Sequence, residues 1–282
     1  TDNQIHSIQE EKDSVIWFDT QNGVSSYDGK TIKNHTKTDN GILQNFSPIT
    51  VTETSQNEWK KKDSDLWFEA GIKEGVYRYD GDKLNYLAFP LHKVLNLYDN
   101  LFAVTSLSKG KNNMIWLGTY AGVFGYNGND FTIINYETLG LDGDIEPLHI
   151  RSILEDSKGR LWIGNNGIGV LLKEEDRIIN FSEKNNLIHP TSKRNGINRS
   201  LLGTLEHVFT IKEDSQGNIW FGDRDAGIWK YDGKKMENYT TNNGLSNDFA
   251  LSIYEDYNGE LWFGMADGNV YKFNGKTFKK QF

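Results

Sequence analysis

The sequence contains no cysteine, and it contains no apolar run of the roughly 18 residues that a membrane-spanning helix needs. The first absence excludes disulfides, thiolate catalysis and cysteine-based zinc sites, although it does not fix the cellular compartment. Positively charged residues are in the minority: the sequence has 31 Lys and Arg residues and 39 Asp and Glu residues, so its net charge is -8. Nucleic acid and anionic membrane surfaces are therefore poor candidates for the main partner.

Familiar catalytic motifs are also missing. The sequence has no Gly-x-Ser-x-Gly nucleophile turn, no His-Glu-x-x-His zinc motif and no glycine loop of the kind that binds phosphate. It has no long apolar pattern with the helical period of about 3.6 residues. We accordingly predict a β protein without a resident cofactor or metal.

One motif occurs three times and organises the whole sequence. Its copies are Ile153-Leu-Glu-Asp-Ser-Lys-Gly-Arg-Leu-Trp-Ile-Gly164, Ile211-Lys-Glu-Asp-Ser-Gln-Gly-Asn-Ile-Trp-Phe-Gly222 and Ile253-Tyr-Glu-Asp-Tyr-Asn-Gly-Glu-Leu-Trp-Phe-Gly264. Looser copies are centred on Trp17, Trp67 and Trp116. A period of roughly 40 to 60 residues is typical of propeller blades rather than of helical repeats.

Each copy predicts four short strands. The first strand leads into the Glu-Asp-Ser-Lys-Gly turn, where Asp and Ser bond the backbone and Gly supplies a positive φ. The second strand, residues 161–163, is apolar at every position, which indicates burial on both faces between neighbouring blades and places the repeat tryptophans in the core. Gly164 then permits a close backbone approach. Asp-Gly or Asn-Gly turns join the third and fourth strands; they follow Tyr27, Tyr79, Tyr126, Tyr231 and Phe273.

The order of these motifs carries a family resemblance. The motifs are Tyr-Asp-Gly-Lys, then Asn238-Tyr239-Thr240, then Asn243-Gly244-Leu245, and then Ile-x-Glu-Asp-x-x-Gly-x-Leu-Trp-x-Gly. Over nearly the whole chain, this order resembles the two-component regulator propeller repeat. That repeat builds periplasmic sensor regions of bacterial hybrid histidine kinases and occurs in separate secreted proteins. The resemblance implies a periplasmic, secreted or surface-anchored location, and it implies no catalytic residues, because the repeat is a scaffold signature.

We predict an all-β, six-bladed β-propeller with four antiparallel strands per blade. It forms a single domain over residues 1–282, with blades at about 1–36, 48–88, 102–136, 149–181, 207–239 and 249–282. Family sensors usually have more blades, followed by a membrane span and a kinase, and this sequence has neither addition. The chain begins at Thr1 without Met, which is consistent with removal of a targeting segment.

The most variable connections define a loop-rich face on which we place the ligand site. They include residues 35–47, 89–100, 137–148 and 182–206, and function usually resides in variable loops on a rigid scaffold. Four of the seven arginines map there: Arg151, Arg194, Arg199 and Arg224. Their planar forks suit carboxylate, sulfate or phosphate. Ordinary ion pairing explains them equally well, because acidic residues such as Glu206 and Asp225 map to the same face.

Other polar and aromatic candidates for the ligand site share this face. Planar polar side chains directly follow the second strands, at Asn165, Asn166 and Asp223, and Tyr120 offers a ring to a saccharide. These residues and the arginines are the predicted ligand contacts.

Three functions fit this pattern. The leading prediction is a non-catalytic, sensor-like extracytoplasmic module for a small molecule or saccharide fragment, including anionic ones. The alternative is a polysaccharide lyase or glycoside hydrolase acting on acidic glycans, in which His149, His189 or His207 would be the base and an arginine or metal would neutralise a uronate. A third is a protein-interaction scaffold that uses the Trp59 insertion, residues 56–62.

Overall fold

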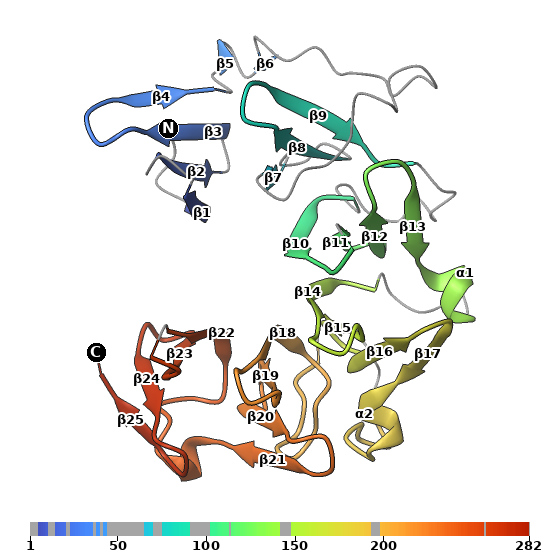
Figure 1. Ribbon diagram of the computed structural model, residues 1–282. Helices are drawn as coiled ribbons and strands as arrows, with labels where there is room; N and C mark the ends of the chain where they lie inside the picture. The colour runs from blue at the N-terminus through green and yellow to red at the C-terminus, as the bar shows by residue number, and fades with distance from the viewer. Residues whose placement is uncertain are drawn as a thin grey trace. The chain divides into compact units, whose positions relative to one another are not determined.

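In the computed structural model, the regular secondary structure is almost all β-strand (Figure 1). It describes residues 5–10, 15–20, 23–35, 38–39, 42–43, 65–69, 75–90, 102–112, 114–141, 148–192, 198–256 and 258–281. Internal contacts divide the chain into two compact units. Unit 1 is Thr1–Val104, Asn112–Ile115 and Phe124–Thr132, and unit 2 is Thr105–Lys111, Trp116–Val123 and Ile133–Phe282. The single-domain arrangement stays a prediction.

Six antiparallel sheets follow one another along the chain, each with its strands in sequence order (Figure 1). The first two contain β1 (Ile5–Glu10), β2 (Ile16–Thr20), β3 (Gly23–Tyr27) and β4 (Ile32–Asn34), then β7 (Leu66–Glu69), β8 (Gly75–Tyr79) and β9 (Leu84–Ala88). The next two contain β10 (Val104–Lys109), β11 (Ile115–Thr119), β12 (Val123–Tyr126) and β13 (Phe131–Ile134), then β14 (Ile150–Glu155), β15 (Leu161–Asn165), β16 (Val170–Glu174) and β17 (Arg177–Asn180). The last two contain β18 (Val208–Glu213), β19 (Ile219–Asp223), β20 (Ile228–Tyr231) and β21 (Met236–Tyr239), then β22 (Ala250–Glu255), β23 (Leu261–Met265), β24 (Val270–Phe273) and β25 (Phe278–Lys280).

These four-stranded meanders are the blades of a propeller, so the prediction of an all-β, six-bladed β-propeller is confirmed. The second sheet has three described strands, and the segment predicted to supply its first strand lies outside the described residues, together with Trp59 and the 56–62 insertion. Short elements lie between the blades: the strand pair β5 (Thr38–Asp39) and β6 (Ile42–Leu43), the helices α1 (Tyr136–Leu139) and α2 (Phe181–Lys184), and the 3-10 helix η2 (Thr241–Asn243).

In the last three blades, the Asp of the repeat closes a turn and fixes the repeat tryptophan. Asp156 Oδ1 accepts bonds from the backbone N–H groups of Lys158 and Arg160, and Asp156 Oδ2 accepts the Trp162 indole N–H at 2.8 Å. Burial raises the pKa of Asp156, but the Trp162 and Arg160 hydrogen bonds outweigh burial and lower it. The same indole bond recurs from Trp220 to Asp214 and from Trp262 to Asp256.

The Glu that precedes this Asp joins neighbouring blades. The Glu213 carboxylate accepts the backbone N–H of Ser157 at 2.6 Å and its hydroxyl at 2.5 Å, and Ser157 lies in the preceding blade. Glu255 accepts the N–H of Ser215 in the same manner, at 2.8 Å. The repeated Glu-Asp pair therefore has two structural tasks, one between blades and one within a blade.

Glycine at the end of the second strand lets the next blade approach. A Cβ added to Gly222 would lie 2.8 Å from the Ala250 carbonyl oxygen, and one added to Gly164 would lie 2.9 Å from the Val208 carbonyl oxygen. Both neighbours belong to the first strand of the following blade, so the close approach predicted at Gly164 is present.

Gly222→Ala should lower the free energy of unfolding by about 1–3 kcal/mol, because the new methyl group would lie 2.5 Å from Thr210 Cγ2 and 2.8 Å from the Ala250 carbonyl oxygen. Urea unfolding followed by tryptophan fluorescence measures this change. Gln216→Ala, an exposed substitution in the same blade, should shift it by less than about 0.5 kcal/mol. Equal values for the two variants would contradict the packing explanation.

Candidate functional site

The first strand of a blade carries one extra residue near its beginning. In unit 2 the pairing register shifts between Ile150 and Ser152 in β14, and equivalent shifts occur in β18 and β22. The extra residues are Arg151, Phe209 and Leu251. A bulge of this kind redirects a side chain and is common beside binding sites. The fold therefore offers one redirected side chain per blade at the same end of the sheets.

Backbone bonds gather several predicted site residues at that end. The N–H of Asn166 donates to the His149 carbonyl at 3.0 Å, and the N–H of Arg224 donates to the His207 carbonyl at 2.9 Å. The His149 N–H donates in turn to the Tyr120 carbonyl at 3.1 Å. These residues from three blades therefore form one continuous rim.

An aromatic clamp lies on this rim, which we define as Tyr120, His149, Arg151, Phe209 and Phe249. The Arg151 guanidinium carbon lies 5.2 Å from the Tyr120 ring centre and 5.0 Å from the Phe209 ring centre. The ring of His149 meets Tyr120 edge-on at 4.9 Å, and that of Phe249 meets Phe209 at 5.1 Å. The clamp thus holds one cation between two aromatic faces.

His149 has an unusual backbone conformation. Its φ is 45°, in the left-handed region that non-glycine residues rarely adopt. The other non-glycine residues with positive φ among those described are Asn112, Glu175 and Asn186, and all three lie in turns. His149 instead directly precedes β14. Strain of this kind clusters at functional sites, which makes the clamp a candidate site on grounds other than charge.

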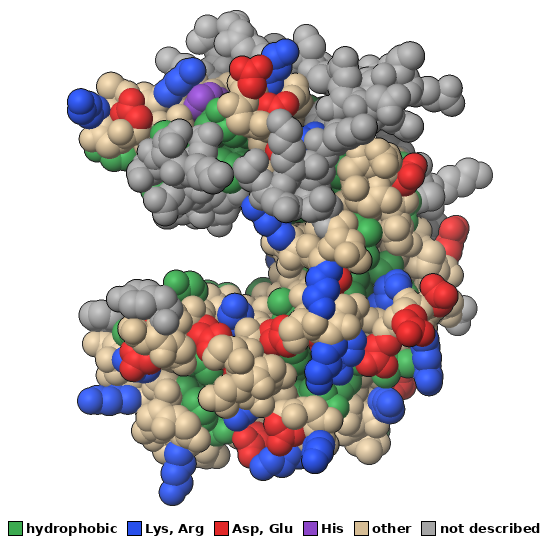
Figure 2. Space-filling model, in the orientation of Figure 1, with side chains coloured by type: hydrophobic (Ala, Val, Ile, Leu, Met, Phe, Trp, Pro, Cys, Tyr) green, Lys and Arg blue, Asp and Glu red, His purple; other side chains and the backbone are tan. Residues whose placement is uncertain are grey.

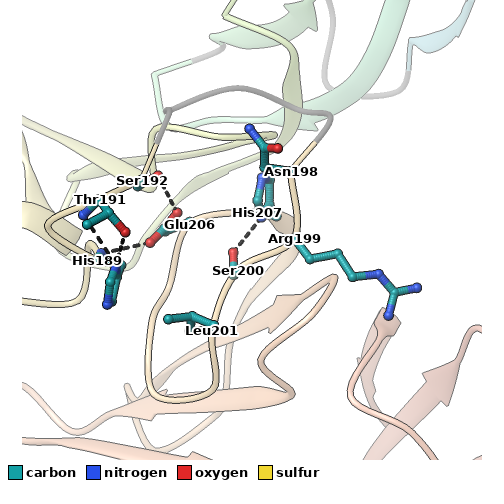
Figure 3. A pocket seen from close by; sticks show the side chains of 9 residues that line it. All are labelled: His189, Thr191, Ser192, Asn198, Arg199, Ser200, Leu201, Glu206 and His207. Carbon is teal, nitrogen blue, oxygen red and sulfur yellow. Dashed lines mark hydrogen bonds between the residues drawn. The ribbon is translucent and has the colours of Figure 1, made fainter.

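A cavity lies in the connection between the fourth and fifth blades. This connection cavity has a volume of about 260 Å³. Its lining residues are His189, Thr191, Ser192, Asn198, Arg199, Ser200, Leu201, Glu206 and His207 (Figure 3). In Figure 3 the Arg199 side chain extends away from the other labelled side chains, and it is 90% exposed. The cavity therefore has polar walls, and the exposed Arg199 guanidinium lies outside them.

Glu206 fixes one wall of the connection cavity. Its Oε1 atom accepts the His189 backbone N–H at 2.8 Å, and its Oε2 atom accepts the Ser192 hydroxyl at 2.6 Å. The His189 imidazole Nδ1 contacts the Thr191 hydroxyl at 2.8 Å. Both bonds of Glu206 hold the His189–Ser192 segment in place, so its role here is structural.

Asp225 fixes the opposite wall. Its Oδ2 atom accepts the Ser200 N–H at 3.1 Å and two Arg224 N–H groups at 2.9 and 3.0 Å. His207 Nδ1 lies 3.3 Å from the same oxygen. Burial raises the pKa of Asp225, but the hydrogen bonds from His207 and Arg224 outweigh burial and hold the pKa at about 2. The carboxylate therefore stays charged at neutral pH and anchors the segment that presents Arg199.

Ser200, His207 and Asp225 do not form a catalytic triad. The Ser200 hydroxyl lies 2.5 Å from His207 Nδ1, which is the same nitrogen that faces Asp225. A triad needs the serine and the aspartate on opposite imidazole nitrogens, so that one activates the nucleophile and the other orients the ring. The arrangement here positions a loop.

Two predicted ligand contacts have structural partners instead. Asp223 is fully buried, and its carboxylate accepts four backbone N–H groups, from Asp225, Ala226, Glu206 and His207. Asn165 is fully buried as well, and its side chain bonds the backbone of Ile168 and Gly169. These side chains close the turns behind the second strands, and their role in ligand binding stays a prediction.

The remaining predicted residues differ in what they can offer. Arg224 bonds Asp225, the Asn166 side chain and the Asn198 carbonyl, so its donors are largely occupied. Arg194 lies outside the described residues. At the clamp, Arg151 contacts Tyr120. At the cavity, His189 and Arg199 are both lining residues, and Arg199 Nε lies 3.8 Å from Asp225 Oδ1 although its side chain is 90% exposed.

Sequence reasoning missed Phe209 as a site residue. Aligning the copies Ile150-Arg-Ser-Ile and Val208-Phe-Thr-Ile places Phe209 at the position of Arg151, which is a usable signal. The alignment alone does not identify a site, because it is the bulge that redirects these side chains, and no residue type in the motif predicts the bulge.

One group among the described residues has the composition of a metal site. Possible ligand atoms of His207, Asp223 and Asp225 lie within 4.8 Å of one another. Each oxygen of Asp223 already accepts two backbone N–H groups, and Asp225 Oδ2 accepts bonds from Ser200 and Arg224. The set therefore has little free acceptor capacity for a cation, and it fits a metal poorly.

The surface charge around these sites is mixed. On the face drawn in Figure 2, acidic and basic side chains are interspersed over the sheets of unit 2 rather than gathered into one basic patch. Such a surface suits recognition of single charged groups better than attraction of a polyanion.

The fold and repeats define a β-propeller, and comparison identifies the repeat. The two-component regulator propeller family model matches residues 144–167, 203–225 and 244–267. The chain thus carries repeats of this family, and the resemblance stated above is confirmed. A comparison with curated proteins found no match.

Similar solved structures share the fold. The extracellular domain of a protein assigned as a hybrid two-component system of B. thetaiotaomicron matches with a TM-score of 0.65 and 21% identity, covering 100% of this chain and 34% of that one. Virginiamycin B lyase from Staphylococcus aureus matches with a TM-score of 0.67 and 12% identity, covering 100% and 85%. PorZ of Porphyromonas gingivalis, a surface component of the type-IX secretion system, matches with a TM-score of 0.59 and 17% identity, covering 96% and 38%. The chain therefore spans about a third of the first of these proteins.

Within the described parts of the chain, no helix combines the length and the apolar character needed to cross a membrane.

Proposed function

We propose that this chain is an extracellular, sensor-type propeller segment that binds a small molecule or saccharide fragment without transforming it. Its family repeats and the similarity to an extracellular two-component domain support the sensor context. The connection cavity supports the binding role, and the exposed Arg199 beside a braced polar wall is the observation that carries it. A periplasmic, secreted or surface-anchored location follows from this function.

The chemistry of the cavity favours recognition over catalysis. Its hydroxyl and imidazole groups offer hydrogen bonds to a polyol, and Leu201 offers an apolar surface. Pockets of this kind use a few placed polar groups to orient a ligand. His207 is 2% exposed and bonded to Ser200, so it is a poor general base for a bound substrate.

Catalysis by a lyase or hydrolase remains the second candidate, because the partly exposed His189 lines the cavity. Mass spectrometry of each ligand after incubation separates the two functions: intact ligand supports recognition, and a product that disappears in His189→Ala supports catalysis.

Arg199→Ala should weaken binding of an anionic ligand by roughly tenfold or more, because a charge-assisted hydrogen bond is lost. A thermal-shift screen against neutral and anionic oligosaccharides identifies a ligand, since a ligand that binds only the folded state raises the melting temperature. Titration calorimetry then measures the dissociation constant for each variant.

Arg177→Ala is the matched control, because Arg177 is also exposed but lies at the opposite turn of the fourth blade. It should leave the dissociation constant unchanged. Equal losses in the two variants would mean that general charge, rather than the connection cavity, attracts the ligand.

A protein-interaction role through the 56–62 insertion stays a prediction, because these residues are not described. If a partner is still pulled down after deletion of residues 56–62, the insertion is not the interaction site.

A further inference from the structure

We propose that the aromatic clamp is a carboxylate receptor, in which Arg151 binds the acid group of a ligand whose carboxylate is attached to a ring. This inference rests on the proposed function and names its ligand class. It concerns the clamp, whereas the proposed function rests on Arg199 in the connection cavity, so the two can be tested separately.

The unbalanced charge of Arg151 is the first argument. Its side chain is partly buried, and its Nε atom is fully buried without a hydrogen-bond partner. Among the described residues, Nη1 bonds only the Tyr120 hydroxyl, at 3.5 Å. No described carboxylate lies within ion-pair distance of Arg151, whereas Arg78, Arg160 and Arg224 each pair with an aspartate. A desolvated cation without a counter-charge is costly, and a bound anion would remove that cost.

The rigidity of Arg151 is the second argument. Tyr120 and Phe209 enclose its guanidinium at 5.2 and 5.0 Å, and Phe249 and His149 support these two rings from outside. A side chain held in this way loses little conformational freedom when it binds. An arginine on an open surface loses more conformational entropy when it binds a ligand. The clamp is therefore preorganised for a ligand group.

The backbone supplies the third argument. Arg151 is the extra residue of the β14 bulge, and His149 two residues earlier has a φ of 45°. The bulge recurs in β18 and β22, but the positive φ does not, because His207 and Phe249, the residues equivalent to His149 in the next two blades, have no positive φ. The local strain therefore accompanies the placement of this one arginine.

The chemistry of the clamp selects the ligand. A guanidinium fork matches the two oxygens of a carboxylate. The flanking aromatic rings offer apolar faces to a ring that bears this acid. A uronate at the end of a saccharide and an aromatic acid both have this chemistry, and the experiment distinguishes them.

The first test uses the unmodified protein. Titration calorimetry compares a galacturonate trimer with its trimethyl ester, which has the same sugar backbone but no charge, and benzoate supplies the non-saccharide arm. We expect at least one acid to bind, and the trimer, if it is that acid, to bind roughly tenfold to a hundredfold more tightly than its ester. Tighter binding by the trimer indicates a uronate, and tighter binding by benzoate indicates an aromatic acid. Equal binding of trimer and ester, or no binding of any acid at millimolar concentration, would overturn the proposal.

The second test changes the clamp. Arg151→Gln should abolish binding of the acid without lowering the melting temperature, since it removes an unbalanced cation. Arg151→Lys should retain weak binding, because the charge stays and the planar fork is lost. Arg177→Gln is the control and should bind like the unmodified protein. Unchanged acid binding in folded Arg151→Gln would refute the proposal.

Arg199→Ala separates this inference from the proposed function. A neutral saccharide whose binding depends on Arg199 and not on Arg151 would support the cavity by itself. Acid binding that is lost in Arg199→Ala and kept in Arg151→Gln would overturn the carboxylate receptor. Acid binding that depends on Arg151 and survives Arg199→Ala would support the receptor by itself.

Discussion

Asp65→Ala should lower the free energy of unfolding of unit 1 by about 3–5 kcal/mol. Asp65 is fully buried, and its Oδ2 atom accepts the Arg78 Nε–H at 2.8 Å and lies 2.7 Å from Nη2. Arg78 is 3% exposed and lies over the Trp67 ring at 5.9 Å. Removing the carboxylate would leave the guanidinium buried without its counter-charge.

Chemical unfolding followed by near-UV circular dichroism measures this loss. A double variant sharpens the test. Asp65→Leu combined with Arg78→Met removes both charges and keeps apolar volume, so it should recover most of the stability. A double variant as unstable as Asp65→Ala would show that the ion pair itself, rather than the abandoned charge, stabilises the unit.

Trp220→Ala should cost about 3–5 kcal/mol in unit 2. Trp220 is 1% exposed, its indole N–H bonds Asp214, and its ring packs on Tyr239, Phe263 and Phe273 at 5.1–6.1 Å. The substitution removes this packing and leaves a cavity.

Trp262 occupies the equivalent position in the last blade and makes the same bond, to Asp256, but it is only partly buried. Trp262→Ala should therefore cost clearly less than Trp220→Ala when both are measured by urea unfolding. Equal losses of unfolding free energy in the two variants would mean that the exposed side of Trp262 is buried in solution. That result would support the prediction of one six-bladed domain.

The blades could be predicted because their determinants are local. Apolar residues at successive positions, such as Leu161 to Ile163, mark the buried second strand, and Asp and Gly fix the turn before it. Each of these signals acts within about ten residues. Trp162 and Trp220 were predicted in the core for the same reason, and both are buried.

The ligand site could be predicted only in part. Its face followed from loop length, and Tyr120, Arg151 and Arg199 were named from it. The availability of each side chain depends on partners that are distant in the sequence. Arg224 is occupied because it reaches Asn166 and Asn198, which are 58 and 26 residues away. Asp223 and Asn165 look like exposed polar residues after a strand, yet they are buried and bonded to the backbone.

The sequence by itself determined the all-β class, the six repeats and the resemblance to two-component regulator propeller repeats, because a repeated local pattern encodes the same strands and turns in each copy. Only the tertiary structure decided which charges are balanced. Arg151 lies between Tyr120 and Phe209 without a carboxylate, whereas Arg78 has Asp65. The physical reason is that burial and ion pairing depend on how strands and blades pack against one another, and sequence spacing carries no information about those distances.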